Sequence, residues 1–464
     1  MRLLHTADWH LGRLLHRVPL LDAQRAVLDG LVALARAEEV DAILLAGDVF
    51  DRALPPVEAV QVAGDALRRL AEVAPVIAIS GNHDSAGRLG FAAELIAAGG
   101  VHLRTEPLRA GEPVVLEDEH GPVAVYALPY LDPDLTREPL GVAERSHEAV
   151  LGAAMARVRA DLARRDGHRA VVVAHAFVQG GEASESERDI SVGGAQTVPA
   201  SVFDGVAYAA LGHLHRPHAV TGGAGAAAAP AGGREGADAD PGLAAGDAGD
   251  GPARGDASPP GASAPADEAG EAAALGGLFA ALAEEEPPPP PAPTPVPPAA
   301  GPRPVVRYAG SPLAYSFTEA DAAKSTAIVD LGPDGVRDVR LVPVPSPFRL
   351  VRLRGELEAL LDDPAHAEHE TEDAWLEVTL TDARLPARPM ERLRRRFPRV
   401  LVLQHAPEGE LAPATVAAAR VQGRSDLEVL ERFVADARGA APTDDERPLL
   451  RDAVERVARR SEED

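Results

Sequence analysis

Five short apolar runs of the sequence end in residues that commonly bind metal ions. The runs end at Asp8 and His10, at Asp48, at Asn82 and His83, at His175, and at His213 and His215. Apolar runs that stop at polar turn residues are typical of buried strands. In an open α/β sheet, ligands gather outside the carboxyl ends of the strands. We therefore expect these side chains to converge, although they lie far apart in the sequence.

The set of side chains is large enough for two metal ions. The candidate ligands are Asp8, His10, Asp48, Asn82, His175, His213 and His215. Two divalent cations about 3.5–4 Å apart share a bridging ligand, and Asp48 is the natural candidate. Histidine and carboxylate ligands without thiolate favour Mn²⁺, Fe²⁺ or Zn²⁺ over Mg²⁺, which prefers oxygen ligands. Such a pair polarises a phosphoryl oxygen and activates water, so the pattern predicts hydrolysis of phosphate esters.

The stretch Gly81-Asn82-His83-Asp84 combines metal and proton chemistry within one turn. Asn82 supplies an amide oxygen to a metal. His83 is placed to stabilise or protonate the leaving oxygen, as a general acid does. We expect Asp84 to hold the His83 imidazole in one tautomer. His83 and Asp84 are therefore the predicted catalytic residues.

The apolar runs alternate with amphipathic segments. We predict strands over 2–7, 41–46, 75–79, 170–174 and 206–211, with one or two more within 112–130 and others over 326–330 and 336–344. Helical spacing of apolar residues predicts helices over 20–39, 57–73 and 146–165, with Ser146 as the N-cap of the last one. Alternation of strands and helices indicates a layered α/β fold.

Composition divides the chain into three predicted domains. Residues 1–345 form the first, interrupted at 221–304 by an Ala-, Gly- and Pro-rich insert that we expect to be disordered. Residues 346–406 alternate strand, helix, strand, helix and strand, which indicates a small α+β domain. Residues 407–464 contain two amphipathic helices, at about 426–437 and 444–460. Each follows a capping-box pattern, formed by Ser425 with Glu428 and by Thr443 with Glu446.

Charge and composition limit the classes of function. The chain has 464 residues, a formal net charge of −26 and no cysteine, which excludes disulfides and thiolate metal sites. It has no long apolar run and no signal-peptide pattern, so we expect a cytoplasmic protein that does not bind membranes. Lys324 is the only lysine, and we interpret the excess of arginine as composition bias.

An acidic protein can contact nucleic acid only through local basic patches or metal ions. Arginines concentrate in the small α+β domain, and our candidate DNA-binding residues there are Arg384, Arg388, Arg392, Arg395 and Arg396. A solvated helix face is the alternative interpretation. The two C-terminal helices have apolar stripes that either form their own core or bind a partner.

These motifs resemble the calcineurin-like metallophosphoesterase superfamily, in which D-x-H, G-D, G-N-H-D, a single His and G-H-x-H occur in this order. Further segments are similar to the SbcD family, the nuclease subunits of the bacterial SbcCD repair complex. They are HTADWHLG (5–12), GDVFD (47–51), GNHDS (81–85), SVGG (191–194), GHLHRP (212–217) and YAGSPL (308–313). The resemblance implies a layered metallophosphoesterase β-sandwich flanked by helices, with a small α+β capping domain and C-terminal helices.

The resemblance also implies an activity: a manganese-dependent 3′→5′ exonuclease on double-stranded DNA that cuts hairpins and single strands as an endonuclease, in DNA repair, recombination and replication. It places Asp8, His10, Asp48 and His215 on one Mn²⁺. It places Asp48, Asn82, His175 and His213 on the other, with His83 catalytic. It implies a homodimer bound to an SbcC-like coiled-coil ATPase. Our guess for the dimer surface is the pair of helices at 57–73 and 86–98, and the C-terminal helices are our candidates for binding the ATPase.

Two other functions use the same residues. The ligands alone also suit a phosphodiesterase or phosphatase for small molecules or phosphoproteins. A non-catalytic tether for DNA ends is the third hypothesis, although every expected ligand and His83 are present. The arginine-rich domain and the helical C-terminus favour a polymeric substrate, and therefore the nuclease.

Overall fold

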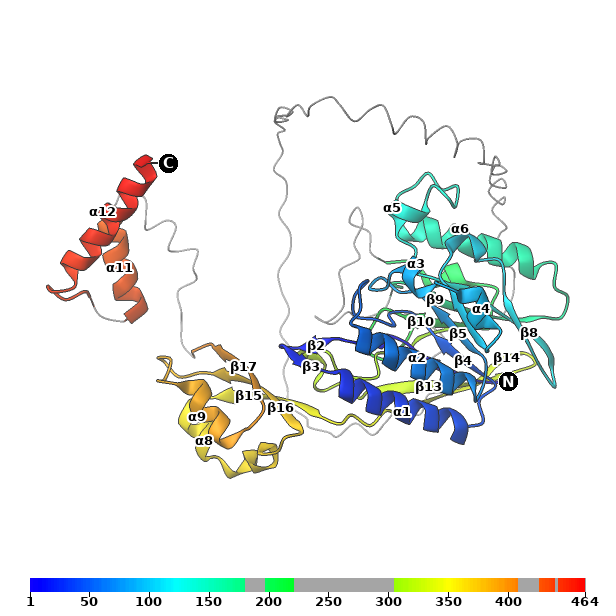
Figure 1. The fold of residues 1–464 in the computed structure, drawn as a ribbon, viewed down its shortest axis with the longest axis horizontal. Helices are drawn as coiled ribbons and strands as arrows, with labels where there is room; N and C mark the ends of the chain where they lie inside the picture. The colour runs from blue at the N-terminus through cyan, green and yellow to red at the C-terminus, as the bar shows by residue number, and fades with distance from the viewer. Residues whose placement is uncertain (180–196, 221–303, 408–424, 439–440, 464) are drawn as a thin grey trace, which may run out of the picture. The chain divides into compact units, whose positions relative to one another are not determined.

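The computed structural model describes residues 1–179, 197–220, 304–407, 425–438 and 441–463. The predicted disorder at 221–304 and the SVGG segment at 191–194 therefore lie outside the described residues, except for Pro304. Two compact units are present: Met1–Val351 with Asp373–Trp375, and Arg352–Glu372 with Leu376–Asp464 (Figure 1). None of the helices in the described part of the chain has the length and apolar character that a membrane span requires.

The first unit contains two six-stranded sheets. The first sheet has the order β14-β13-β1-β4-β5-β6. Its strands are β1 (Arg2–Thr6), β4 (Ala42–Leu45), β5 (Val76–Ile79), β6 (Val101–Arg104), β13 (Ser325–Gly332) and β14 (Gly335–Pro343). Strands β1, β4, β5 and β6 are parallel, whereas β13 runs antiparallel to β1. The carboxyl ends of the four parallel strands therefore meet at one edge of the sheet.

The second sheet has the order β11-β12-β10-β9-β8-β7. Its strands are β7 (Val114–Asp118), β8 (Gly121–Leu128), β9 (Arg169–His175), β10 (Tyr208–Gly212), β11 (His218–Ala219) and β12 (Val305–Tyr308). Strands β8, β9, β10 and β12 are parallel. Strand β12 follows the insert in sequence but pairs beside β10, so the insert interrupts the chain without interrupting the sheet.

The main core lies between the two sheets. Leu44 and Ile77 of the first sheet share a buried cluster with Val171 and Val173 of the second. Alternate residues of β9, such as Val172, face the opposite way and belong to a second cluster with the helix α6 (His147–Leu162). Side chains on successive strand residues point to opposite faces, so each sheet buries both of its faces. This arrangement is the layered α/β sandwich that the sequence predicts.

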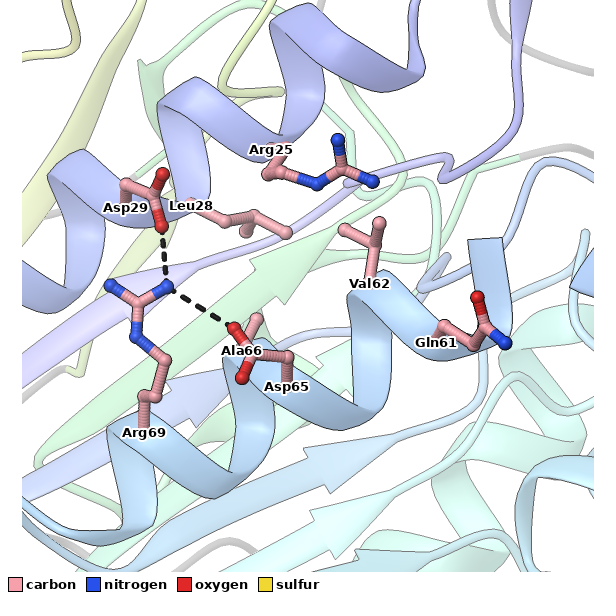
Figure 2. A pocket seen from close by; sticks show the side chains of 8 residues that line it. All are labelled: Arg25, Leu28, Asp29, Gln61, Val62, Asp65, Ala66 and Arg69. Atoms are coloured by element: carbon pink, nitrogen blue, oxygen red, sulfur yellow. Dashed lines mark hydrogen bonds and ion pairs between the residues drawn. The ribbon is translucent and has the colours of Figure 1, made fainter. Parts of the chain in front are cut away.

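Two longer helices, α1 (Leu21–Ala37) and α2 (Val57–Ala71), pack side by side next to the first sheet (Figure 1). Arg69 of α2 links the two helices, because its guanidinium contacts Asp29 of α1 as well as Asp65 of α2. The three side chains line a small pocket (Figure 2). The predicted helices at 20–39, 57–73 and 146–165 are confirmed within a few residues. Ser146 caps α6 as predicted, because its Oγ accepts a hydrogen bond from the Ala149 N–H.

The predicted helix at 86–98 is wrong as a single element. The chain forms two short helices, α3 (Ala86–Leu89) and α4 (Ala93–Ala97), and Ala92 between them has a left-handed φ of 58°. The remaining short elements of this unit are β2 (Leu14–Leu15), β3 (Val18–Pro19), α5 (Pro133–Thr136), η1 (Pro107–Arg109), η2 (Ala200–Phe203) and η3 (Phe317–Glu319).

The small α+β region has the predicted order of elements. It comprises β15 (Arg349–Gly355), α8 (Leu357–Asp362), η4 (Pro364–His369), β16 (Ala374–Leu380), α9 (Pro389–Arg396) and β17 (Val400–His405). The three strands form a sheet in the order β15-β16-β17, in which β16 and β17 are parallel. Leu357, Leu393 and Phe397 are buried and anchor α8 and α9.

The two C-terminal helices are α11 (Asp426–Arg438) and α12 (Arg447–Glu463). The capping box of α11 is confirmed: the Ser425 N–H donates to Glu428 Oε2 at 2.8 Å, and the Glu428 N–H donates to Ser425 Oγ at 3.4 Å. Helix α12 begins a few residues later than predicted. The two helices contact each other, with Arg447 Nε 3.6 Å from Glu431 Oε1.

Candidate metal centre

The carboxyl ends of five parallel strands position the seven predicted ligands. Asp8 and His10 follow β1, Asp48 follows β4, and Asn82 follows β5. In the second sheet His175 is the last residue of β9, and His213 and His215 follow β10, whose last residue Gly212 pairs with His175. All seven side chains are buried except that of Asn82, which is partly buried. The structure therefore brings the predicted ligands together between the two sheets.

Several of these residues have a left-handed backbone conformation. Asp8, His10, Asp48 and His213 all have positive φ, from 44° to 105°. Such conformations cost about 1–3 kcal/mol each in non-glycine residues and are concentrated at functional sites. The adjacent glycines are required for close contact. A β-carbon on Gly47 would lie 2.5 Å from Nδ1 of His175, and one on Gly212 would overlap the Ala46 carbonyl.

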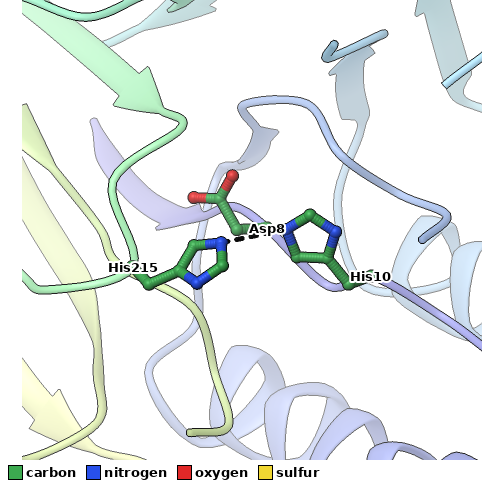
Figure 3. Close-up of side chains that lie close together, drawn as sticks. All are labelled: Asp8, His10 and His215. Carbon is green, nitrogen blue, oxygen red and sulfur yellow. Dashed lines mark hydrogen bonds between the residues drawn. The ribbon is translucent and has the colours of Figure 1, made fainter. Parts of the chain in front are cut away.

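Asp8, His10 and His215 form a first group of donor atoms that lie within 4.8 Å of one another (Figure 3). The Nε2 atoms of His10 and His215 are 3.0 Å apart and point toward each other. The Asp8 carboxylate is fixed beside them, because Oδ1 accepts a hydrogen bond of 2.9 Å from the His213 N–H. Two imidazole nitrogens and a carboxylate that converge in this way make a set of ligands typical of a divalent transition metal.

A second group surrounds Asn82. Its Oδ1 lies 2.8 Å from Nε2 of His175 and 3.3 Å from Nδ1 of His213. Nδ1 of His175 lies 2.9 Å from the Ala46 carbonyl oxygen, which can only accept, so the ring proton is on Nδ1. Nε2 then presents its lone pair to Asn82 Oδ1, which is also an acceptor. A cation between these atoms would turn this unfavourable contact into coordination, so the residues fit a metal.

The Asp48 carboxylate lies between the two groups. Its Oδ2 is 3.5 Å from Nε2 of His10 and 3.6 Å from Nε2 of His175. Its Oδ1 accepts a hydrogen bond of 2.8 Å from the His83 N–H, which fixes the orientation of the carboxylate. One carboxylate oxygen is therefore within reach of donor atoms from both sheets.

Three histidines of the centre, His10, His175 and His213, have lowered pKa values that favour the neutral imidazole. Burial lowers the pKa of His175 to about 4, although the hydrogen bond to Ala46 partly opposes this effect. Burial and the neighbouring imidazoles lower the pKa of His10 and of His213 well below the usual range. Nδ1 of His10 is buried and makes no hydrogen bond to any residue that the structure describes. Neutral imidazoles keep a lone pair for a metal, which is the protonation state that coordination requires.

His83 and Asp84 have different surroundings from those expected. Nδ1 of His83 lies 2.7 Å from the Asp51 carbonyl oxygen, and its ring packs edge-on against His10 with centroids 4.6 Å apart. The Asp84 carboxylate instead accepts hydrogen bonds from the N–H groups of Gly81, Val49 and Phe50, at 2.9–3.1 Å. Asp84 therefore ties two metal-centre loops together, and a backbone carbonyl rather than Asp84 holds the His83 ring.

Burial and the nearby Asp48 charge raise the pKa of Asp84 to about 7, against the opposing effect of the three amide groups. The carboxylate is thus held in a low-dielectric position, where it is costly to ionise. Because its oxygens accept hydrogen bonds from backbone N–H groups, Asp84 fixes the conformation of the loop.

Sequence reasoning missed two residues that support His10. Gln24 Nε2 donates to the carbonyl oxygens of Trp9 and His10, at 3.0 and 2.7 Å, and the Tyr315 hydroxyl also donates to the Trp9 carbonyl. Gln24 is a polar residue on the buried face of α1, and this position was a visible signal. Tyr315 lies far away in the sequence, so no local pattern connects it with His10.

The candidate DNA-binding arginines lie on or near α9, and most of them form ion pairs. Arg392 contacts Glu358 at 2.6 Å, and Arg395 contacts Glu391 at 2.6 Å. Arg396 is largely buried, pairs with Glu370 and donates to the carbonyl oxygens of Leu360, Leu361 and Asp363. Arg388 lies 3.8 Å from Glu391 and is exposed, and Arg384 lies in the loop before α9. Arg396 is thus part of the fold of this unit.

Comparisons with known proteins place the chain in a family. Residues 1–217 match the family model described as calcineurin-like phosphoesterase, and residues 347–438 match the model SbcD_C, described as type 5 capsule protein repressor C-terminal domain. Among solved structures, the chain is similar to TT1561 of Thermus thermophilus, with 19% identity and a TM-score of 0.26, over 39% of this chain and 70% of that one.

A curated relative extends over almost the whole chain. The chain is 30% identical over 424 residues to the D subunit of the nuclease SbcCD from Bacillus subtilis (strain 168), which covers 86% of this chain and 84% of the relative. The chain therefore belongs to the SbcD family of calcineurin-like metallophosphoesterases.

Proposed function

We propose that the chain is the metal-dependent DNA nuclease subunit of an SbcCD-type complex and that it hydrolyses phosphodiester bonds. The observation that carries this proposal is the position of Asp48, whose Oδ2 lies 3.5 and 3.6 Å from imidazole nitrogens of two separate donor groups. The relative from Bacillus subtilis is a nuclease, and the present chain has the donor atoms that such chemistry requires.

Two divalent cations, Mn²⁺ in our proposal, would occupy the centre. Asp8, His10, Asp48 and His215 would hold one, and Asp48, Asn82, His175 and His213 would hold the other. When bound, the pair polarises the scissile phosphate and supplies the hydrolytic water at neutral pH. Because His10, His175 and His213 are buried and neutral, they can bind the cations without first losing a proton.

His83 is the proposed group for the leaving oxygen. Its Nδ1 donates to the Asp51 carbonyl at 2.7 Å, so this hydrogen bond fixes the ring beside the His10 imidazole. A ring held in this way can stabilise or protonate the departing oxygen through its other nitrogen. Asp84 contributes indirectly by fixing the loop that carries Asn82 and His83.

The proposed substrates are double-stranded and hairpin DNA. Among the arginine-rich residues, Arg388 and Arg395 have highly exposed side chains, at 82% and 74%, and are the best candidates for phosphate contact. Arg384 and Arg392 remain candidates beside them, whereas Arg396 has a structural role. We place the protein in the cytoplasm, where it would act in DNA repair, recombination and replication.

The proposed partners are a second copy of the chain and an SbcC-like coiled-coil ATPase. Val57, Phe91 and Leu95 are between 68% and 80% exposed on α2 and around α4, which supports this surface as the homodimer interface. Phe433 of α11 and Leu449 of α12 are exposed at 66% and 68% and support a role of these helices in binding the ATPase. The three domains that we propose, at 1–345, 346–406 and 407–464, would then carry catalysis, DNA contact and partner binding.

Digestion of DNA tests the function directly. Blunt-ended and hairpin DNA are incubated with Mn²⁺ and either the wild type, Asp48→Ala or His83→Ala, with and without the ATPase partner. We expect the wild type to degrade both substrates. His83→Ala should lose at least about a hundredfold in rate, as when a general acid is removed, and Asp48→Ala should lose at least as much because it lacks the ligand shared by the two cations. Absence of digestion with the partner present, together with hydrolysis of cyclic nucleotides or phosphoproteins, would contradict the nuclease proposal.

Truncation tests the partner-binding region. A chain that ends before Glu408 should keep its Mn²⁺-dependent nuclease activity but should fail to co-purify with the ATPase. Co-purification of the truncated chain would show that the helices are not required for this contact.

A further inference from the structure

The segment that follows the insert surrounds one predicted metal ligand, His215. Nζ of Lys324 donates to the His215 carbonyl oxygen and to Ser311 Oγ, at 2.9 Å each, and also contacts Glu319 Oε2. The Ser311 N–H donates to the same carbonyl at 3.1 Å. His215, Ser311, Glu319 and Lys324 are all buried. The backbone of His215 is therefore fixed by residues that lie about a hundred positions later in the sequence.

The position of Lys324 explains why it is a lysine in a chain whose other basic residues are arginines. An ammonium group has three donors, and Lys324 contacts a carbonyl, a hydroxyl and a carboxylate. The planar guanidinium of arginine has five donors in a wider fork, which would leave buried N–H groups unpaired here. The site thus requires a compact point charge, beyond any bias in composition.

Glu319 connects this network to the imidazole. Its side chain is completely buried, and Oε1 lies 3.6 Å from Nδ1 of His215. A carboxylate beside Nδ1 favours the tautomer with the proton on that nitrogen and leaves the lone pair on Nε2. Nε2 of His215 is the atom that faces Nε2 of His10 at 3.0 Å. Lys324 supplies the positive charge that a buried carboxylate requires.

We propose that Glu319 and Lys324 are positioning residues that fix the tautomer and the orientation of His215 for metal binding. This inference rests on the proposed metal centre. His175 has a neutral partner in the same role, since its Nδ1 lies 2.9 Å from the Ala46 carbonyl. Such partners fix the tautomer and the ring orientation of a metal-binding histidine. Loss of Glu319 should therefore weaken the cation that His215 helps to hold, whereas His175 keeps its own partner, the Ala46 carbonyl.

The test compares Mn²⁺ binding by full-length variants. In Glu319→Gln/Lys324→Met both buried charges are removed together, because removing one alone leaves the other uncompensated in the core. Lys324→Arg keeps the charge but changes the shape. Asp321→Asn removes an exposed carboxylate of the same segment and is the matched control. Calorimetric titration gives the number and affinity of bound ions, and thermal melting without metal shows whether each variant folds.

We expect the wild type and Asp321→Asn to bind two Mn²⁺ ions. In the double variant one of the two affinities should fall about ten- to a hundredfold, the range typical of a lost partner of a metal-binding histidine, while the other stays unchanged. Lys324→Arg should also lower the affinity for one of the two Mn²⁺ ions. In protein labelled with ¹⁵N-histidine and free of metal, the signals of one imidazole should change in the double variant.

Each outcome has a distinct meaning. Two unchanged affinities in a folded double variant would overturn the inference and leave the proposed function intact. An equal loss at both ions, with a lower melting temperature, would mean that the network only stabilises the fold. If the wild type binds no divalent cation, the proposed function itself fails. Should the double variant not fold, the Mn²⁺ affinities and the ¹⁵N-histidine spectrum of Lys324→Arg decide between these cases.

Discussion

Gly81 lies directly against the Asp48 carboxylate: a β-carbon on Gly81 would overlap Oδ1 and come within 2.7 Å of Cγ. The contact joins the loop after β5 to the loop after β4, and it places the shared carboxylate between the two donor groups. The glycine before Asn82 is thus required by packing against the metal centre.

Gly81→Ala should displace Asp48 and weaken Mn²⁺ binding by about tenfold or more, since small displacements of a ligand are costly in a preorganised site. Titration with Mn²⁺ measures the effect. Gly152→Ala is the matched control, because a β-carbon on Gly152 has no neighbour within 4 Å and the residue lies inside α6. The control should bind Mn²⁺ normally and be more stable by about 0.5–1 kcal/mol. Normal Mn²⁺ affinity of Gly81→Ala would contradict this interpretation of the contact.

Local patterns were sufficient to predict most of the fold and the convergence of the ligands. Apolar runs identify the buried strands. Within each sheet, parallel strands bring the residues at their carboxyl ends together: Asp8 and Asp48 in one sheet, and His175 and His213 in the other. The N-cap at Ser146 was predictable for the same reason, since capping depends on neighbouring residues.

Contacts between distant residues could not be predicted in this way. The partner of His83 is a backbone carbonyl, that of Asp51, which has no signature in the sequence. Glu319 and Lys324 acquire their role only when β12 and β13 bring their segment beside His215. The single lysine was visible in the sequence, but only its contacts with a carbonyl, a hydroxyl and a carboxylate distinguish a structural requirement from composition bias.

Arg169, the first residue of β9, forms an ion pair with Asp118 that should stabilise the fold less at acidic pH. Arg169 contacts both carboxylate oxygens of Asp118, and Asp118 also lies 2.7 Å from the Met1 amino group. Burial alone would raise the pKa of Asp118, but the hydrogen bonds from Arg169 and Met1 hold it below its ordinary value. A lowered pKa stabilises the folded state fully above the unfolded-state value of about 3.9. The stabilisation is lost as the pH falls through the folded-state pKa.

Asp118→Asn should therefore lower the free energy of unfolding by about 1.5–3 kcal/mol at pH 7, the usual contribution of hydrogen bonds to a charged group. The difference from the wild type should shrink progressively below about pH 4. Urea unfolding at several pH values measures both quantities. Glu119→Gln is the control, because that side chain is 84% exposed. A difference that is independent of pH would mean that the carboxylate charge is not responsible.

The contacts at the two ends of residues 221–303 predict that this insert can be removed without disturbing the metal centre. The Val220 N–H donates to the Val306 carbonyl oxygen at 2.9 Å, and β11 pairs with β12 through His218 and Tyr308. The chain ends that flank residues 221–303 are thus held side by side by the sheet. A short Gly- and Asn-containing turn can join such antiparallel strands.

Replacement of residues 221–303 by such a turn should leave the number of bound Mn²⁺ ions and the nuclease rate unchanged, within about twofold of the wild type. The melting temperature should also be preserved. Loss of Mn²⁺ binding on deletion would show that the insert contributes to the site. Loss of nuclease activity with intact Mn²⁺ binding would instead assign it a role in substrate contact.

We expect substitution of the exposed arginines and of the buried arginine in the arginine-rich region to have different effects. Arg388 and Arg395 reach solvent and pair with the exposed Glu391, and exposed ion pairs contribute little to stability. Charge reversal of both residues to Glu should weaken binding of duplex DNA and reduce the slope of log K against log salt by about 0.9 for each phosphate that is no longer contacted. Arg25→Glu, a reversal at a 54% exposed arginine of α1, is the control for overall charge.

Arg396→Glu should have a different effect. The Arg396 side chain is only 14% exposed and donates to three backbone carbonyl oxygens, so a carboxylate there would be buried next to acceptors and would destabilise the small unit. Loss of DNA binding by this variant would accompany a lower melting temperature, whereas the reversal of Arg388 and Arg395 should leave melting unchanged. If that reversal leaves binding the same at every salt concentration, DNA does not contact this face of the small α+β region.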